Sequence, residues 1–331
     1  MGNMNDRAPL HESFRPCRDM LLALTLIFGL STYLYGVRVL IIVAISVLTA
    51  LLCDLLAAAM RGTGWEASDI SSYVFALTLA AMLPASVSYL TAAYAVAVAV
   101  LLGKHVFGGW SGLVFHPAAL GYAVAAVGSP ADVLKYPAPF KTLGLGLSAG
   151  DVQLYDGVST TLRLKAVPNT DIVDLIMGRY AAPMGTAFTL VIIASLVLFI
   201  AHSAVTRHVP IAFLTVCAAW SVIAPRLPVT RRLSLEYEMS AGGLLFAAVF
   251  ILPLPAIAPK NPRAKIAYGV IAALAAIAFR TMTSYELGVC FASLLTTPLA
   301  AWLDAVAGWF EARHAERQPA GKKMKGGEAD G

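Results

Sequence analysis

A glycine- and proline-rich stretch at 104–118 lies between two long apolar runs and constrains the fold more than any other feature of the chain. Gly108, Gly109, Gly112 and Pro117 make this stretch a poor helix. Irregular backbone that faces lipid is not viable in hydrocarbon, so the stretch must be enclosed by protein or line a polar cavity. The sequence therefore predicts a broken helix at membrane depth, a feature of the working centre of many membrane proteins.

The composition is that of a polytopic membrane protein. Hydrophobic residues form 59% of the chain and charged residues 13%, and the mean hydropathy is +0.75. A soluble domain is about 45–50% apolar and about 25% charged. The net charge of +5 is modest and is interpreted as membrane topology, so we expect no nucleic-acid partner. The four cysteines are scattered without metal-ligand spacing, so we expect small buried hydrophobes and no metal site.

Ten apolar segments approach the length of about 20 residues that crosses a bilayer. They fall at 20–37, 39–60, 71–85, 86–103, 113–128, 184–203, 207–225, 240–258, 265–280 and 285–308. A long polar stretch separates the first five from the last five. The pattern predicts an all-α integral membrane fold with about ten transmembrane helices.

An odd number of spans in each half inverts the second half relative to the first. Each half also contains an irregular stretch, Phe107–Pro117 in one and Pro253–Pro259 in the other. Paired interruptions predict inverted repeats with a site at their interface, and two unrelated loops are the alternative. The distribution of Lys and Arg predicts that both termini are cytoplasmic.

The predicted organisation has five parts. They are a cytoplasmic N-terminal segment at 1–19, a first five-helix repeat at 20–128, an extracytoplasmic loop at 129–183, a second five-helix repeat at 184–310 and a basic cytoplasmic tail at 311–331.

Several short strings occur in a characteristic order along the chain. They are Gly103-Lys104, Phe107-Gly108-Gly109, Phe115, Pro117-Ala118-Ala119-Leu120-Gly121, Asp174-Leu175-Ile176-Met177-Gly178, Val209-Pro210-Ile211-Ala212-Phe213-Leu214, Ser240-Ala241-Gly242-Gly243-Leu244-Leu245-Phe246 and Ser284-Tyr285-Glu286-Leu287-Gly288-Val289. On these strings the chain resembles RnfD, a membrane component of the Rnf ion-translocating electron-transport complex. It is similar also to the homologous NqrB of the sodium-pumping NADH:quinone reductase.

The resemblance implies two inverted five-helix repeats with broken helices on a urea-transporter-like scaffold. It also implies FMN, attached through its phosphate to a threonine of the external loop, and electron transfer coupled to movement of Na⁺ or H⁺. The implied partners are other Rnf-type membrane subunits and a periplasmic flavoprotein subunit, within the lipid bilayer of a bacterial cytoplasmic (inner) membrane. Binding of riboflavin or a quinone stays open.

The family's attachment motif reads approximately Asp-x-x-Ser/Thr-x-Ala-Thr, and its last threonine accepts FMN. In this chain Asp156 and Ser159 match the motif, but Leu162 falls on the acceptor position. Leucine has no hydroxyl, so no phosphoester can form there. We expect Thr161 to be the preferred acceptor if the flavin is attached, and Thr160 the second.

Other departures from the family replace polar groups by apolar ones. Leu113 and His116 stand where the family has two asparagines, and Leu254 stands within a Thr-Asp-Pro step. Polar groups at membrane depth are expensive and are normally retained for a task. The chain is therefore interpreted as a divergent paralogue. The resemblance implies a membrane subunit that serves as scaffold and as a flavin electron relay. The alternatives are a non-redox channel or transporter on the same scaffold that has lost flavin, and a purely structural partner of other subunits.

Few polar groups remain within the predicted spans. Lys104 can pair with an anionic flavin or quinone oxygen, or it can extend to the membrane interface. His116 can donate a hydrogen bond or relay a proton, or it can be a packing residue. Asp54 is a candidate for the ion path, with a solvated cavity wall as the alternative. Arg280 and Glu286 are expected to form an interfacial pair, and no catalytic residue is assigned.

Overall fold

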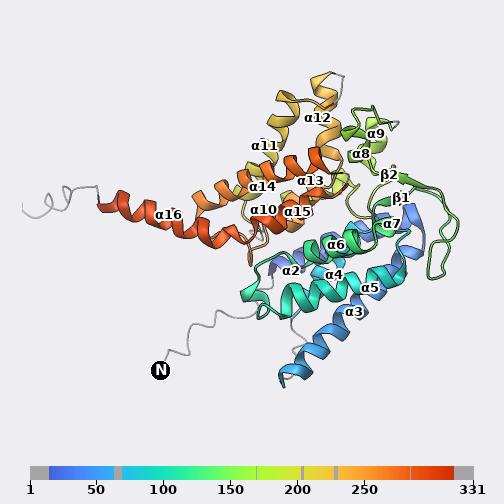
Figure 1. Ribbon diagram of the computed structural model, residues 1–331, viewed down its shortest axis with the longest axis horizontal. Coiled ribbons are helices and arrows are strands. Elements are labelled where there is room, and N and C mark those ends of the chain that lie inside the picture. The colour runs from blue at the N-terminus through green and yellow to red at the C-terminus, as the bar shows by residue number, and fades with distance from the viewer. Residues whose placement is uncertain are drawn as a thin grey trace, which may run out of the picture.

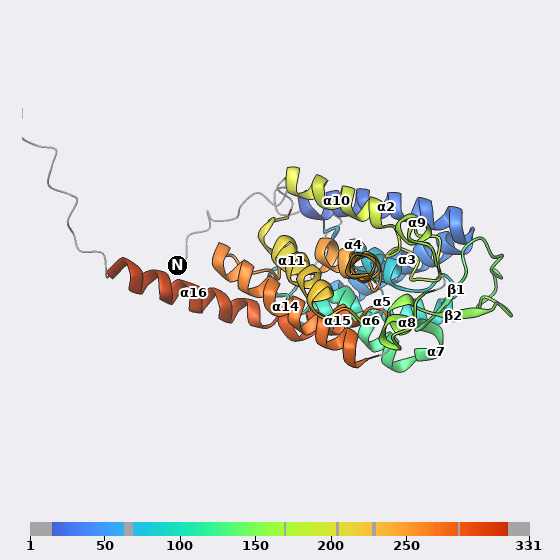
Figure 2. The same ribbon diagram turned by 90° about the horizontal axis from the view of Figure 1, so that it is seen from above.

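The structure is a computed structural model that describes residues 15–62, 69–168, 170–202, 205–226, 230–283 and 285–316. The predicted N-terminal segment up to residue 14 and the basic tail from 317 lie outside these residues. Within them the regular structure is helical apart from one two-stranded sheet, as Figures 1 and 2 show. This confirms the predicted all-α class.

The first half of the chain forms five helical segments, and an irregular stretch with one 3₁₀ turn separates the fourth from the fifth. Its elements are α2 (Arg15–Tyr35), α3 (Arg38–Arg61), α4 (Ser71–Met82), α5 (Tyr89–Val98) continued by the π-helix η1 (Ala99–His105), the 3₁₀ turn η2 (Trp110–Gly112) and α6 (Pro117–Gly128). The connecting region contains α7 (Pro130–Val133), β1 (Lys135–Pro137), β2 (Leu154–Asp156), α8 (Val158–Arg163) and α9 (Ile172–Met177). Strands β1 and β2 pair antiparallel, with Tyr136 opposite Tyr155.

The second half contains two bent helices, and its π-helix follows the third helix rather than the fourth. Its elements are α10 (Thr189–Ala201), α11 (His208–Ile223), α12 (Arg231–Ser240), α13 (Leu244–Phe246) continued by the π-helix η3 (Ala247–Ile251), α14 (Pro262–Met282), α15 (Gly288–Thr296) and α16 (Leu299–Glu316).

Only some of these helices can cross a membrane unaided. In the described part of the chain α2, α3 and α14 are long and apolar enough, with 21, 24 and 21 residues. Two bent pairs raise the number to five if each is one span: α12 with α13–η3 at 56°, and α15 with α16 at 48°. A 12-residue helix such as α4 is about 18 Å long, whereas the hydrocarbon core is about 30 Å thick. The short helices therefore need protein around their ends.

The eighth apolar segment differs from its predicted range of 240–258. The helix begins at Arg231, breaks at Gly242 and Gly243, and ends at Ile251. Both glycines have positive φ angles, 71° and 64°, which allow the chain to turn between α12 and α13. The fifth segment likewise becomes helical only from Pro117, because the glycine-rich stretch before it is irregular.

The order of elements corrects the predicted pairing of interruptions. The irregular stretch at 106–116 follows the fourth helix of its half, α5–η1, whereas 252–261 precedes the fourth helix of its half, α14. By position, 252–261 corresponds to 83–88, between α4 and α5. Both of these breaks begin with a Leu-Pro step, at Leu83 and Leu252. Proline ends the preceding helix in each case because it supplies no backbone N–H.

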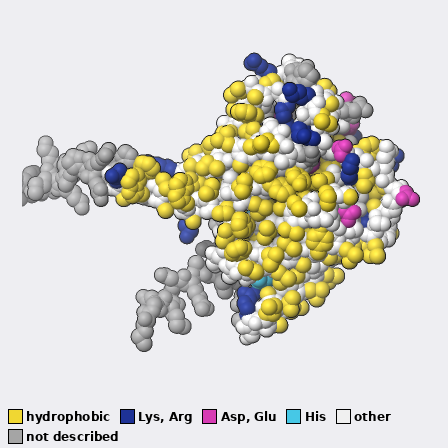
Figure 3. All heavy atoms as spheres, viewed as in Figure 1, with side chains coloured by type: hydrophobic (Ala, Val, Ile, Leu, Met, Phe, Trp, Pro, Cys, Tyr) yellow, Lys and Arg dark blue, Asp and Glu magenta, His cyan; other side chains and the backbone are white. Residues whose placement is uncertain are grey.

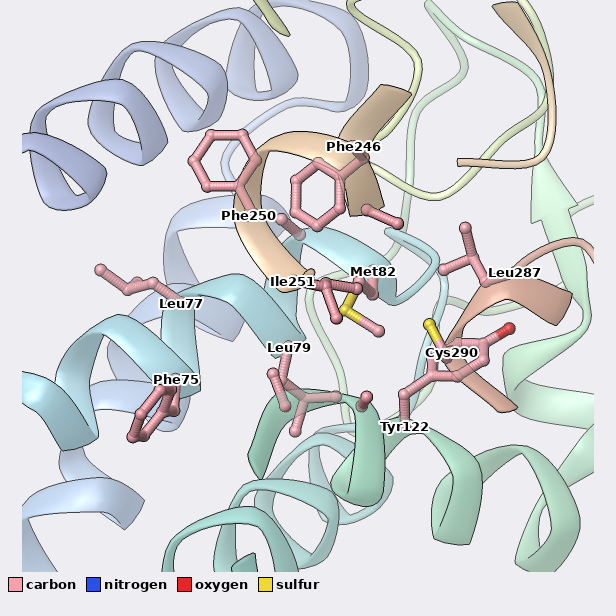
Figure 4. Packing of buried hydrophobic residues seen from close by; sticks show 14 of the residues in the cluster. Phe75, Leu77, Leu79, Met82, Tyr122, Phe246, Phe250, Ile251, Leu287 and Cys290 are labelled. Atoms are coloured by element: carbon pink, nitrogen blue, oxygen red, sulfur yellow. The ribbon is translucent and has the colours of Figure 1, made fainter. Parts of the chain in front are cut away.

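The core lies where the short helices of the two halves meet. Figure 4 shows side chains of α4, η3, α6 and α15 packed together. Eleven of the twelve residues of α4 are buried, as are all five of η3. The rings of Phe246 and Phe250 stack with their centroids 4.7 Å apart. A Cβ added at Gly121 would lie 2.5 Å from the Ala95 oxygen, so a glycine is needed where α6 crosses α5.

A buried arginine holds the break between α4 and α5. Arg38 is fully buried, and its guanidinium donates to the backbone oxygens of Ala85 (3.0 Å), Val87 (2.8 Å) and Gly144 (2.5 Å). It also lies 4.4 Å from the centre of the Tyr89 ring. One charged side chain therefore satisfies main-chain carbonyls of the break and fixes the connecting region beside the start of α5.

An aspartate holds the break between η3 and α14 in a similar way. The Asp304 carboxylate of α16 accepts backbone N–H groups of Lys260 (2.8 Å) and Asn261 (2.9 Å) at the start of α14. The Asn261 side chain in turn caps the helix by accepting from the Arg263 N–H at 2.9 Å. These contacts fix the direction in which α14 enters the helical body.

The molecule has two distinct ends. Helix α16 projects from one end, and α8, α9, β1 and β2 lie at the other (Figures 1 and 2). We call these the α16 end and the α8 end. Helix α5 begins beside the connecting region and η1 ends toward the α16 end, whereas α14 runs the opposite way. Hydrophobic side chains cover the middle of the face drawn in Figure 3, with charged side chains toward its margins.

Candidate functional site

A buried charged cluster forms around Lys104 at the end of η1. The Lys104 ammonium donates to Asp69 Oδ2 at 2.7 Å and to Ser72 Oγ at 2.6 Å, and lies 3.8 Å from Asp54 Oδ1. Ser72 Oγ also donates to Asp54 Oδ1 at 2.7 Å. His105 Nε2 lies 2.7 Å from the same Asp54 oxygen. We call Asp54, Asp69, Ser72, Lys104 and His105 the Lys104 cluster.

The elements that supply the cluster explain its burial. Asp54 comes from α3, Ser72 from the first turn of α4 and Lys104 from η1, so three helices enclose it. Lys104 is 1% exposed and Asp54 8%. The π-helical turn widens the end of the fourth helix, and such turns are frequent at functional sites. An isolated charge would not be tolerated at this depth, so the ammonium and the carboxylates stabilise each other.

The Lys104 ammonium acts mainly on the Asp69 carboxylate. Burial alone would raise the pKa of the Asp69 carboxyl, but the Lys104 ammonium and the hydrogen bonds from Lys104 and Ser71 hold that pKa below its ordinary value. Arg61 reaches the outer side of the cluster, with Nη2 2.7 Å from His105 Nδ1. An external flavin or quinone oxygen would therefore have to compete with Asp69 for Lys104.

A second buried charged cluster lies at the α8 end, around Arg280 at the end of α14. Arg280 Nη2 lies 3.3 Å from Glu238 Oε2, and Nη1 donates to the Glu238 backbone oxygen at 2.9 Å. Arg226 forms a two-pronged ion pair with Glu238 and donates to the Arg280 backbone oxygen at 3.0 Å. We call Arg226, Glu238, Arg280 and Glu286 the Arg280 cluster.

Glu286 does not pair with Arg280 in the expected manner. Its Oε2 accepts the backbone N–H of Ser159 at 2.8 Å, and its Oε1 accepts that of Gly242 at 3.0 Å. Glu286 is 2% exposed. In the described residues, the ion-pair partner of Arg280 is Glu238. The predicted Arg280–Glu286 pair is absent from the described contacts because the two carboxylate oxygens of Glu286 accept main-chain N–H groups instead.

The flavin-motif-like segment is the short helix α8 with the end of β2. Leu162 is fully buried, beside Val158, Leu175 and Tyr237, in a small apolar cluster. Thr160 and Thr161 are half-buried on other sides of the helix. Ser159 is buried, and its Oγ lies 3.4 Å from Arg280 Nη2. Leu162, at the acceptor position of the motif, is thus part of the hydrophobic core of the connecting region.

Asp156 lies at the exposed end of β2. Its Oδ1 forms an ion pair with Lys135 Nζ of β1 at 3.0 Å, and both side chains are about half exposed. The pair supports the register of the two strands. Asp156, Ser159, Thr160 and Thr161 therefore share one segment at the α8 end.

His116 lies apart from both clusters, in the core. Its ring packs edge-on against Phe75 with the centroids 5.6 Å apart, and the side chain is 1% exposed. The Phe250 backbone lies within hydrogen-bonding reach of the ring. His116 thus lies in the irregular stretch of the first half, near the Phe250 backbone of η3. Asp54 and Lys104 are brought together as described, but His116 is not part of their cluster.

Several of these polar residues escaped the sequence reasoning. Asp69, Ser72, Arg226 and Glu238 were not predicted to contribute, although each is a polar residue beside or within an apolar segment. Only 13% of the residues are charged, so a charged residue next to an irregular stretch is itself a reason to expect a buried polar contact there. The partners were not readable because they lie far apart in the sequence.

Fold and site together define a polytopic membrane protein with broken helices and a buried charged cluster at each end. The chain matches the NQR2, RnfD, RnfE family over residues 11–308 and belongs to this family. This confirms the resemblance on which the sequence expectations were built.

Similar proteins are named as a subunit of an ion-translocating oxidoreductase complex. The protein of Pseudomonas paraeruginosa is 27% identical over 291 residues, which cover 82% of this chain and 84% of that protein. The protein of Actinobacillus succinogenes is 25% identical over 342 residues, which cover 92% and 96%. That of Actinobacillus pleuropneumoniae is 25% identical over 305 residues, which cover 83% and 88%.

The Lys104 cluster predicts a large effect of removing its cation. Lys104→Met leaves Asp54 and Asp69 without their ammonium in a buried place, and breaking a buried pair costs about 3–5 kcal/mol. We expect a lower unfolding temperature of the purified protein in detergent. Lys104→Met combined with Asp69→Asn should recover part of the loss, and Lys141→Met, at an exposed loop position, should have no effect. An unchanged unfolding temperature for Lys104→Met would contradict the account of this cluster.

Proposed function

We propose that this chain is the membrane scaffold subunit of an Rnf-type ion-translocating oxidoreductase complex in a bacterial cytoplasmic membrane. The family match over residues 11–308 carries the proposal. The relatives named as subunits of such complexes match along most of their own length. A subunit of this kind works with other membrane subunits and with a periplasmic flavoprotein subunit, and it does not oxidise a soluble substrate alone.

We further propose that the two halves are inverted repeats. Five helical segments occur in each half, from α2 to α6 and from α10 to α15, and together with the opposite directions of α5 and α14 in Figure 1 they support this. Each half also ends its fourth helix with a buried cation, Lys104 in one and Arg280 in the other. The two cations lie at opposite ends of the molecule, as inversion requires.

The flavin relay is the redox part of the proposal, with Thr161 as the attachment residue. Leu162 does not fit the group, because it is apolar and fully buried. Thr161 precedes it, carries a hydroxyl and is half-buried, and Arg163 and Lys165 follow with charges that suit a phosphate. Bound FMN would supply one-electron transfer. The residues of α8 would hold and orient it at the α8 end.

A non-redox paralogue on the same scaffold is the second candidate. The observation that favours it is that Leu162 occupies the acceptor position of the motif and packs in the apolar cluster with Val158 and Leu175. In that case α8 would be a structural element of the connecting region, and the chain would act as a channel, a transporter or a holder of subunits.

The flavin proposal is tested by fluorescence of the denatured protein in a gel under ultraviolet light. Co-expressed with the maturing flavin transferase, the wild-type chain should give a yellow fluorescent band. Thr161→Val should abolish the band, whereas Thr160→Val should leave most of it, and Thr281→Val, on α14, should leave all of it. A wild-type chain without fluorescence would overturn covalent attachment and favour the second candidate.

We propose that the Lys104 cluster lies on the ion path, with Asp54 as its central acceptor. Asp54 Oδ1 is shared by Ser72 and His105, and Lys104 lies 3.8 Å away. A carboxylate that already accepts a hydroxyl and an imidazole can exchange one of them for a proton or a hydrated cation.

Asp54→Asn should therefore lower redox-driven cation uptake into vesicles several-fold while the complex still assembles. The amide keeps the size of the side chain but removes its charge, so a packing role would be preserved. Asp151→Asn, an exposed loop position, serves as the control. Uptake equal to that of wild type would leave Asp54 as part of a cavity wall only.

A further inference from the structure

Glu286 joins two breaks that are distant in the sequence. One carboxylate oxygen accepts the Ser159 N–H in the first turn of α8, and the other accepts the Gly242 N–H between α12 and α13. Glu286 itself lies just before α15. A single side chain thus ties the connecting region to two broken helices of the second half. Hydrogen bonds to an ionised carboxylate are about twice as strong as those between neutral groups.

Two glycines make this approach possible. A Cβ at Gly157 would overlap the Glu286 carboxylate. Gly242 has a φ of +71°, and a Cβ there would meet Ser159 Oγ and lie 2.9 Å from Arg280 Nη2. Both positions therefore need glycine for steric reasons. Glu286 and Ser159 can approach these two glycines only when α8 is docked in this position.

Arg280 adds a second contact to the same segment. Its Nη2 lies 3.4 Å from Ser159 Oγ and 3.4 Å from the Ala241 oxygen. With Glu238 and Arg226, the cluster contains two cations and two carboxylates, so the docked segment rests on a group that is neutral as a whole. The inner face of α8 is apolar: Val158 is 6% exposed and Leu162 0%. Thr160 and Thr161 are only half-buried.

We propose that Glu286 is the positioning residue that docks α8 on the second half and so sets where Thr160 and Thr161 are presented. The proposal rests on the proposed function of α8 as the attachment segment. Glutamine in place of Glu286 keeps the size but has one oxygen and one NH₂ group. The NH₂ group would face a backbone N–H, so one of the two main-chain donors would lose its acceptor. Undocking would then expose the inner face of α8.

The test is the rate at which a thiol on that inner face reacts with a bulky maleimide in the full-length detergent-purified protein. The probe position is Val158→Cys. The four native cysteines are buried, at 0–6% exposure, and give a low background. We expect Glu286→Gln to raise the labelling rate at position 158 by about tenfold or more, because a lost charged hydrogen bond shifts the local opening equilibrium by at least that factor. Glu236→Gln is the matched control, since Glu236 lies on the surface of α12 with Arg232.

The outcomes are distinct. Faster labelling at position 158 alone supports the proposal. An unchanged rate overturns it, and so does equal exposure of the native cysteines, which would make Glu286 a residue of general stability. If Glu286→Gln does not accumulate, Gly242→Ala takes its place. Its methyl group would press on Ser159, and it should expose position 158 with the carboxylate intact. Continued protection in that variant would overturn the proposal.

Gel fluorescence separates this inference from the proposed function. If the wild-type chain carries flavin at Thr161, Glu286→Gln should reduce the fluorescent fraction several-fold, and a full fraction would overturn the role in presenting that threonine. If the wild-type chain carries none, the attachment proposal fails. The labelling rate still decides whether Glu286 docks α8.

Discussion

Main-chain polar groups at helix breaks need partners, and at three breaks of this chain charged side chains provide them. Arg38 donates to carbonyls between α4 and α5, Asp304 accepts N–H groups at the start of α14, and Glu286 accepts N–H groups beside α8 and α13. In hydrocarbon an unsatisfied backbone group costs several kcal/mol, so a broken helix persists only where such a partner exists.

The two buried clusters lie at the ends of two different helices, η1 and α14. Lys104, at the end of the fourth helix of the first half, pairs with Asp69 and Asp54. Arg280, at the end of the fourth helix of the second half, pairs with Glu238. Each cation follows a helix that runs toward a different end. The scaffold therefore offers one polar site at each end, separated by the packed core around Phe246 and Phe250. An electron carrier at one end and an ion path at the other would suit this layout.

Hydropathy and glycine content predicted the membrane class, the helical fold and an irregular stretch at Phe107–Pro117, which the structure has at 106–116, because those features depend on local composition. They did not predict which breaks correspond, since the Leu-Pro step at Leu83 lies inside a continuous apolar run and gives no polar signal. Nor did they predict the role of Glu286. Its partners Ser159 and Gly242 are 127 and 44 residues away, and main-chain donors have no sequence signature. The attachment residues of α8 were predicted from the motif and stay a prediction, and the burial of Leu162 could be seen only in the fold.

Hydrogen exchange at single-residue resolution tests the central claim most directly. The amides of Ser159, Gly242 and Asn261 lie at breaks yet are bound by carboxylates, so the account predicts exchange as slow as that of helix amides. The exposed loop residue Lys141 should exchange at the rate of an open chain. Rapid exchange at Ser159, Gly242 and Asn261 would contradict the view that charged side chains hold the breaks together.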